Sequence, residues 1–162
     1  EAYESGFLGP RNAPLFVKAK TRQSVSAEGF TELGVDDLRP HPAVGPRGAA
    51  ARLKLLESVQ QDTARGATGA THSHDAILQR AVRLMQSEAG KVFDLSEEPV
   101  EVRQAYGPGV FGQGCLLARR LVERGVPFVE VSLGDFGRWD THNDNFNTVQ
   151  QLSQELDAGW GT

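Results

Sequence analysis

The sequence predicts an α/β domain that is mostly helical and contains one strong buried strand. Residues 126–133 form an apolar, β-branched run interrupted only by Glu130 and Ser132, a pattern typical of a strand buried on both faces. Patterns of helical spacing stand on both sides of this run, and helix, turn, strand, loop and helix in succession are typical of a parallel sheet. Residues 1–46 lack such periodicity and are rich in Gly and Pro, which predicts an irregular lead.

The composition is that of a globular protein with one core. The chain has 162 residues, of which 39% are hydrophobic and 23% are charged, and this size suits one domain. Its formal net charge is −4 and it contains no basic block, so nucleic acid is not expected as a partner. No apolar run approaches the roughly 18 residues that a membrane span needs. No signal peptide is visible, and the single Cys115 lies in a helical pattern, where we expect a buried structural thiol.

Beyond residue 46, five stretches predict helices. They begin near Arg47, Ser73, Ser96, Gly114 and Asp144. Breaks at Gly66, Gly90, Gly107 and Gly125 separate them, and Gly125 follows its helix as a left-handed stop. The last two helices have the clearest apolar faces, formed by Leu116, Leu117, Leu121 and Val122 and by Phe146, Val149, Leu152, Leu156 and Trp160.

Both ends of the chain suggest a piece of something longer. The chain begins at Glu1 without a Met and stops at Thr162, directly after a helical pattern. We therefore interpret residues 1–162 as a single incomplete domain, truncated at both ends. Residues 1–46 would wrap over a larger body, and residues 47–162 would carry the helices and the strand-loop-helix core.

Two motifs invite a functional interpretation that their context does not support. Gly107-Pro-Gly-Val-Phe-Gly112 has the letters of a dinucleotide fingerprint, but no strand precedes it and a Pro stiffens the loop, so a turn before a helix is favoured. His72-Ser-His-Asp75 could bind a metal, but such residues at a helix start are usually capping or solvated groups. His41, between two prolines, is less informative still.

The loop after the predicted strand holds the strongest candidate site. Asp140 and His142 lie two residues apart where a strand would end, so both can face one crevice and offer O and N ligands to Zn²⁺ or Mn²⁺. The carboxylate could instead orient the imidazole. A third interpretation is purely structural: Asp140, Thr141 or Asn143 caps the next helix while Trp139 anchors the core. From spacing, the structural interpretation is favoured.

Longer motifs change that balance, because together they resemble one bacterial family. The matching runs are Tyr3-Glu-Ser-Gly-Phe-Leu-Gly9, Phe93-Asp-Leu-Ser-Glu-Glu-Pro99, Tyr106-Gly107, Phe111-Gly-Gln-Gly-Cys-Leu-Leu-Ala-Arg-Arg-Leu-Val-Glu123 and Trp139-Asp-Thr-His142 with Asp144-Asn-Phe146. In this order and spacing the chain resembles the large uncharacterised sulfatase-like family catalogued as domain of unknown function 1501. The stretch Gly134-Asp-Phe-Gly-Arg138 is longer than the usual approach to the Trp-Asp motif of that family.

The resemblance implies an alkaline-phosphatase-like α/β fold and a metal centre built from Asp and His on loops at strand ends. Asp140 and His142 look like the Asp-and-His element of that centre, with Asn143 and Asn145 as supporting residues. The metal would be divalent, with Zn or Mn favoured over Ca. The resemblance further implies a periplasmic or secreted protein, whose amino-terminal part and later motifs lie outside these 162 residues. No catalytic residue is assigned.

Two functions follow as hypotheses. The first is a central fragment of an exported, metal-dependent hydrolase-like protein that acts on sulfate or phosphate esters, with a small-molecule or polysaccharide ester as substrate. The fragment itself is expected to be inactive, because catalytic metal sites generally use three protein ligands. The second is a non-catalytic secreted binding or scaffold protein that keeps the fold and not the reaction, since fold does not imply function.

Overall fold

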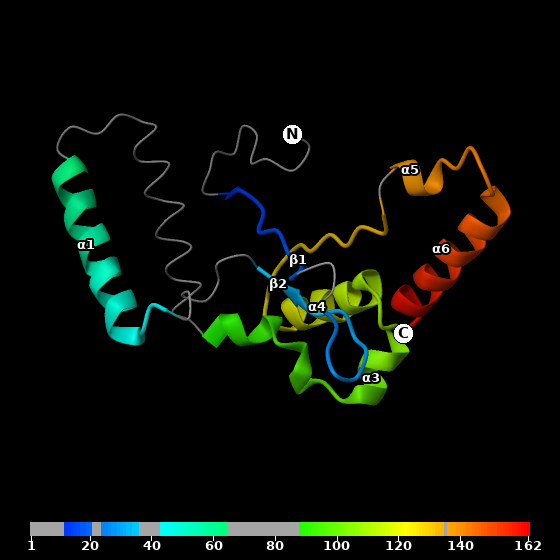
Figure 1. Ribbon diagram of the computed structural model, residues 1–162, viewed down its shortest axis with the longest axis horizontal. Coiled ribbons are helices and arrows are strands. Elements are labelled where there is room, and N and C mark those ends of the chain that lie inside the picture. Colours follow the sequence, from blue (N-terminus) through cyan, green and yellow to red (C-terminus); the bar gives the residue numbers. More distant parts are fainter. Residues whose placement is uncertain (1–11, 21–23, 36–42, 65–87, 135) are drawn as a thin grey trace. The chain divides into compact units, whose positions relative to one another are not determined.

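The computed structural model describes residues 12–20, 24–35, 43–64, 88–134 and 136–162 (Figure 1). Within these ranges the chain is mostly helical and has one small antiparallel sheet. Its elements are β1 (Lys18–Ala19), β2 (Leu33–Gly34), α1 (Pro46–Ala64), the 3-10 helices η3 (Glu88–Phe93) and η4 (Leu95–Glu97), α3 (Val100–Ala105), α4 (Val110–Glu123), α5 (Phe136–Trp139) and α6 (Asn145–Trp160). The helix predicted from Ser73 and the residues His41 and His72–Asp75 lie outside the described ranges.

The chain divides into two compact units. The first contains residues 1–16 and 35–90, and the second contains residues 17–34 and 91–162. In the first, α1 begins as predicted, with Pro46 in its first turn and the Ala49 N–H donating to the Gly45 carbonyl. Its apolar side chains are incompletely covered, since Leu55 and Val59 are 64% and 53% exposed. The prediction of a single incomplete domain stays a prediction.

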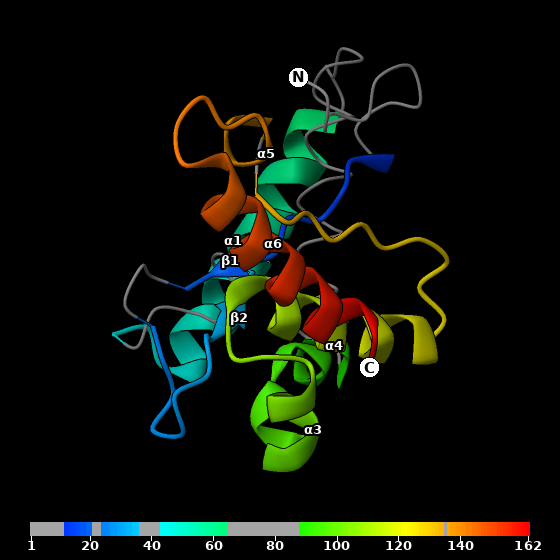
Figure 2. The same cartoon turned by 90° about the vertical axis from the view of Figure 1, so that its right-hand side faces the viewer.

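The core of the second unit lies where α4 packs against its neighbours. Helices α4 and α6 pack against each other, and Figures 1 and 2 show the C-terminal end of α6 beside α4. Their close approach requires that Gly159 of α6 has no side chain, because a Cβ built there would lie only 2.7 Å from the Phe111 ring of α4. The described buried apolar residues all belong to this unit, namely Phe30, Leu33, Val92, Phe93, Leu95, Tyr106, Phe111, Leu116, Leu117 and Leu152.

A β-hairpin-like segment closes one side of this core. Lys18 pairs with Gly34 and Ala19 pairs with Leu33 in the antiparallel sheet. The turn between the strands places Phe30 in the core, where its ring lies 4.3 Å below the Arg103 guanidinium. The Thr31 N–H also donates to the Pro108 carbonyl at 2.9 Å, which ties the segment to the turn between α3 and α4.

A turn precedes α4 as predicted, but the helix begins at Val110, four residues before the predicted start near Gly114. Gly107 has φ +90, a left-handed conformation that favours glycine. A Cβ built at Gly112 would lie 1.9 Å from the Tyr106 carbonyl oxygen, so α4 can begin this close to α3 only because residue 112 has no side chain. The helix ends where predicted, with Gly125 at φ +85. Cys115 is half-buried, and this burial raises the pKa of its thiol.

The prediction of a buried strand at residues 126–133 is wrong for this structure. The segment is extended, but it pairs with no strand among the described residues (Figure 1). Phe128 is 77% exposed, whereas Val129, Val131 and Leu133 are half-buried. The composition produced the extended backbone, but a strand also needs a neighbouring ladder, and Val131 lies instead against Gly114 of α4.

The apolar faces of the last two helices are only partly as predicted. Leu116, Leu117 and Leu152 are almost fully buried. Val122, Phe146 and Trp160 were expected inside but are 57%, 88% and 79% exposed. Periodicity assigns these residues to a helix face, but it does not supply a neighbour that covers the whole length of that face.

Candidate functional site

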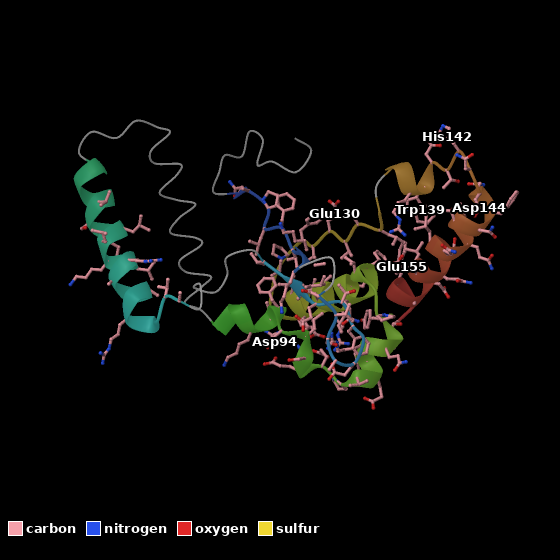
Figure 3. The ribbon with its side chains drawn as sticks, in the orientation of Figure 1. Asp94, Glu130, Trp139, His142, Asp144 and Glu155 are labelled. Carbon is pink, nitrogen blue, oxygen red and sulfur yellow. The ribbon has the colours of Figure 1, made fainter. Side chains whose placement is uncertain are left out.

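The candidate site is the loop that joins the extended segment 126–133 to α6. Gly134 turns the chain with φ +74, and the four-residue helix α5 follows. Residues 140–144 then lead into α6, which begins at Asn145. Figure 3 shows His142 at the outer tip of this loop.

Asp140 and His142 lie together on the outer side of the loop. The His142 Nδ1 atom is 4.0 Å from the Asp140 Oδ1 atom and 3.3 Å from the Asp140 backbone oxygen. The two side chains are 82% and 81% exposed, so nothing in the described chain shields them from water. When Nδ1 donates its proton to the Asp140 carbonyl, the lone pair of His142 resides on Nε2, the nitrogen that is then free for a ligand.

This pair of donors fits part of a metal site. Zinc binds imidazole nitrogen and carboxylate oxygen at about 2.0–2.2 Å, so two such atoms on one ion lie at most roughly 4.3 Å apart. Asp140 Oδ1 lies 4.0 Å from the Nδ1 edge of the imidazole, and both side chains are exposed, so they can turn to bring Nε2 and a carboxylate oxygen toward a shared ion. Within the described residues no group of three or more His, Cys, Asp or Glu side chains converges as a metal site. The donor set here is therefore two residues.

The side chains between and after this pair bond within the loop. Thr141 Oγ1 donates a hydrogen bond to the Asn145 side-chain oxygen, and Asn147 Nδ2 donates to Asp144 Oδ1 at 2.6 Å. Asp144 occupies the N-cap position of α6 in a left-handed conformation, φ 52, but its side chain caps no backbone N–H. Asn143 is exposed. Asn145 thus orients the loop through Thr141, and Asn143 makes no described contact.

Sequence spacing did not identify the residues that hold the base of the loop. The Trp139 indole Nε1–H donates to the Leu133 carbonyl at 2.8 Å, although Trp139 is 40% exposed and is not the core anchor considered above. Arg138 lies 3.8 Å from Glu155 on α6. The two partners are 17 positions apart, a separation that no local spacing rule connects. The one available signal was the unusual length of residues 134–138.

Comparison with known families identifies the chain. The sequence model of a family described as a protein of unknown function, DUF1501, matches residues 1–162. The chain belongs to the DUF1501 family. The match confirms the resemblance drawn from the motifs and covers the whole sequence, including Trp139-Asp-Thr-His142. No curated protein and no solved structure matches the chain. None of the helices in the described ranges is long and apolar enough to cross a membrane.

Proposed function

We propose that this DUF1501 chain is part of an exported metal-dependent hydrolase that acts on sulfate or phosphate esters. The observation that supports the proposal is the placement of Asp140 and His142, whose exposed side chains lie side by side on one loop, with His142 Nδ1 4.0 Å from Asp140 Oδ1. Their position after an extended apolar segment and before a helix agrees with an alkaline-phosphatase-like fold for the whole protein, which we propose with it.

The residues of the loop have separate tasks in this proposal. Asp140 supplies a carboxylate oxygen and His142 supplies an imidazole nitrogen, while the Asp140 carbonyl holds the other ring nitrogen and fixes the tautomer. Asn145 keeps Thr141 turned inward, so that its two neighbours face the same side. A bound Zn²⁺ or Mn²⁺ would polarise the ester oxygen and lower the pKa of a bound water. A small-molecule or polysaccharide ester is the substrate class we propose.

A second candidate is a secreted binding or scaffold protein without catalysis. The side chains of Asp140 and His142 are both more than 80% exposed, which favours this candidate, because most small-molecule sites are concave and bury the molecule they bind. The two candidates share the fold and differ in ester turnover. Metal binding therefore tests the first candidate, and ester hydrolysis by the whole protein, since this chain alone is expected to be inactive, separates the two.

The test is a titration of the purified chain with Zn²⁺, in which binding is measured by calorimetry and by the NMR signals of the His142 imidazole. We expect one weak site, and we expect His142→Ala and Asp140→Ala each to lower the affinity at least tenfold, because each removes one of two ligands. Asp157→Ala, an exposed carboxylate on α6, is the control and should leave the affinity unchanged. Equal binding by wild type and both loop variants would contradict the assignment.

A further inference from the structure

The loop alternates between side chains that bond to the protein and side chains that face water. Trp139, Thr141 and Asp144 each hydrogen-bond to another part of the loop or its flanks. Asp140 and His142, which lie between them, are more than 80% exposed. The bonds of these neighbours, together with the contact of His142 Nδ1 with the Asp140 carbonyl, hold the pair on the outer side of the loop.

The contact nearest to the pair is made by Trp139. Its indole N–H donates to the Leu133 carbonyl at 2.8 Å, a bond that closes the chain over residues 134–138. Asp140 follows Trp139 directly, so the position of the indole fixes where the backbone of the pair begins. Figure 3 shows Trp139 at the base of the loop and His142 at its tip.

A second contact secures the same base from α6. Arg138 reaches Glu155 across 3.8 Å, and α5 packs on α6. This path depends on Gly134, because a Cβ built there would lie 2.7 Å from Arg138 Cδ, and its φ of +74 is strained for any other residue. Because Gly134 has no side chain, the aliphatic part of the Arg138 side chain has room to extend toward Glu155.

We propose that Trp139 is a positioning residue for the Asp140–His142 pair, and that its indole N–H, supported by the Arg138–Glu155 contact, orders the loop for metal binding. The metal part of this statement rests on the proposed function. The loop order does not, because the contacts that produce it are protein–protein contacts. The two parts can therefore fail separately.

The first experiment measures loop order without metal. In Trp139→Phe the ring remains but the donor is lost, so ¹⁵N relaxation should report faster backbone motion at residues 139–143. The global unfolding midpoint should remain close to that of wild type, since Trp139 is 40% exposed. Trp160→Phe, which removes an indole that is 79% exposed at the end of α6, is the matched control and should leave the loop unchanged.

The second experiment adds Zn²⁺ alone. Trp139→Phe should weaken Zn²⁺ binding about two- to tenfold, the range that loss of one neutral hydrogen bond gives. Arg138→Met should weaken it less, because an exposed ion pair contributes little. Linkage requires the reverse effect, so Zn²⁺ should slow hydrogen exchange of the Trp139 indole N–H and leave that of Trp160 unchanged. Asp140→Ala should abolish this Zn²⁺-dependent protection. A merely structural role for Trp139 would give no protection that depends on Zn²⁺.

Each outcome decides one part. Unchanged relaxation at residues 139–143 in Trp139→Phe would overturn the positioning role, whether or not Zn²⁺ binds. Equal Zn²⁺ affinity of wild type and Trp139→Phe would also overturn it. No Zn²⁺ binding by wild type, together with increased loop motion in Trp139→Phe, would overturn the proposed metal site and leave the ordering role of the indole supported.

Discussion

Two regions of the second unit both contain polar and charged side chains, but one region buries them and the other exposes them to water. At the junction of α4 with α3 and η4, Gln113 is fully buried and Arg120 is 3% exposed, and both are held by several partners. In the loop before α6, Asp140 and His142 are more than 80% exposed. This difference in burial indicates which polar groups are available for function. Polar groups at the junction are committed to the fold, whereas those of the loop can bind a ligand without costing the protein its core.

The junction is held by two sets of hydrogen bonds. Gln113 accepts from Arg103 Nε at 2.9 Å and donates to the carbonyls of Arg103 and Gly107. Arg120 donates to Glu98 at 2.5 Å and to Glu97 at 2.8 Å. Burial lowers the pKa of the Arg120 guanidinium, but these bonds outweigh that effect and the pKa lies above its ordinary value. Such a network stabilises one arrangement of the turns around α4.

The largest effect is expected from Gly112→Ala. The added Cβ would meet the Tyr106 carbonyl oxygen at 1.9 Å and the Gly107 carbonyl oxygen at 2.6 Å, and backbone atoms cannot turn aside as side chains do. We expect a loss of about 3 kcal/mol or more in the free energy of unfolding, measured by urea denaturation. Gly114→Ala on the same helix is the control, because its Cβ would meet only a side-chain atom, Val131 Cγ1, at 3.1 Å. Equal losses would contradict the role of the close backbone approach at Gly112, since helix propensity alone makes Gly→Ala stabilising at both positions.

The second prediction compares two amides, one from each region. Gln113→Leu leaves Arg103 Nε and two carbonyls without their partner in the core, and each unsatisfied buried group costs about 1–3 kcal/mol. We expect a loss of roughly 2–4 kcal/mol for this variant. Asn143→Leu in the exposed loop should change stability by less than about 0.5 kcal/mol. Comparable losses at both positions would remove the distinction between the two regions.

Much of this arrangement follows from the sequence, and the exceptions have physical causes. Local signals predicted α1, α4 and α6 and the breaks at Gly107 and Gly125, because helix periodicity and capping act within a few residues. The predicted stop at Gly90 was wrong, because Gly90 lies inside the 3-10 helix η3. The choice of Asp140 and His142 as the candidate site came from the family resemblance, because spacing alone favoured a structural role. The buried strand at 126–133 was wrong because the same apolar run can lie half-exposed against one helix when no ladder adjoins it. Local composition does not contain that information.

The contacts that hold the site were outside the reach of spacing rules for a related reason. Trp139 reaches a carbonyl six residues back, and Arg138 reaches Glu155 on another helix. Both depend on the left-handed turn at Gly134. A glycine in sequence indicates that such a turn is permitted, but only the folded chain shows which side chains it brings together.

The smallest effects are expected from neutralising single carboxylates, and they should follow burial. Glu98 and Glu97 bind the same guanidinium, but their side chains are 15% and 50% exposed, and Asp140 is 81% exposed. Glu98→Gln should therefore cost roughly 1–2 kcal/mol, Glu97→Gln about 0.5 kcal/mol, and Asp140→Asn less than that, because water screens exposed pairs. The order can be read from urea midpoints at one pH. If Asp140→Asn cost as much as Glu98→Gln, the loop carboxylate would be part of the fold, and its availability for a metal would have to be abandoned.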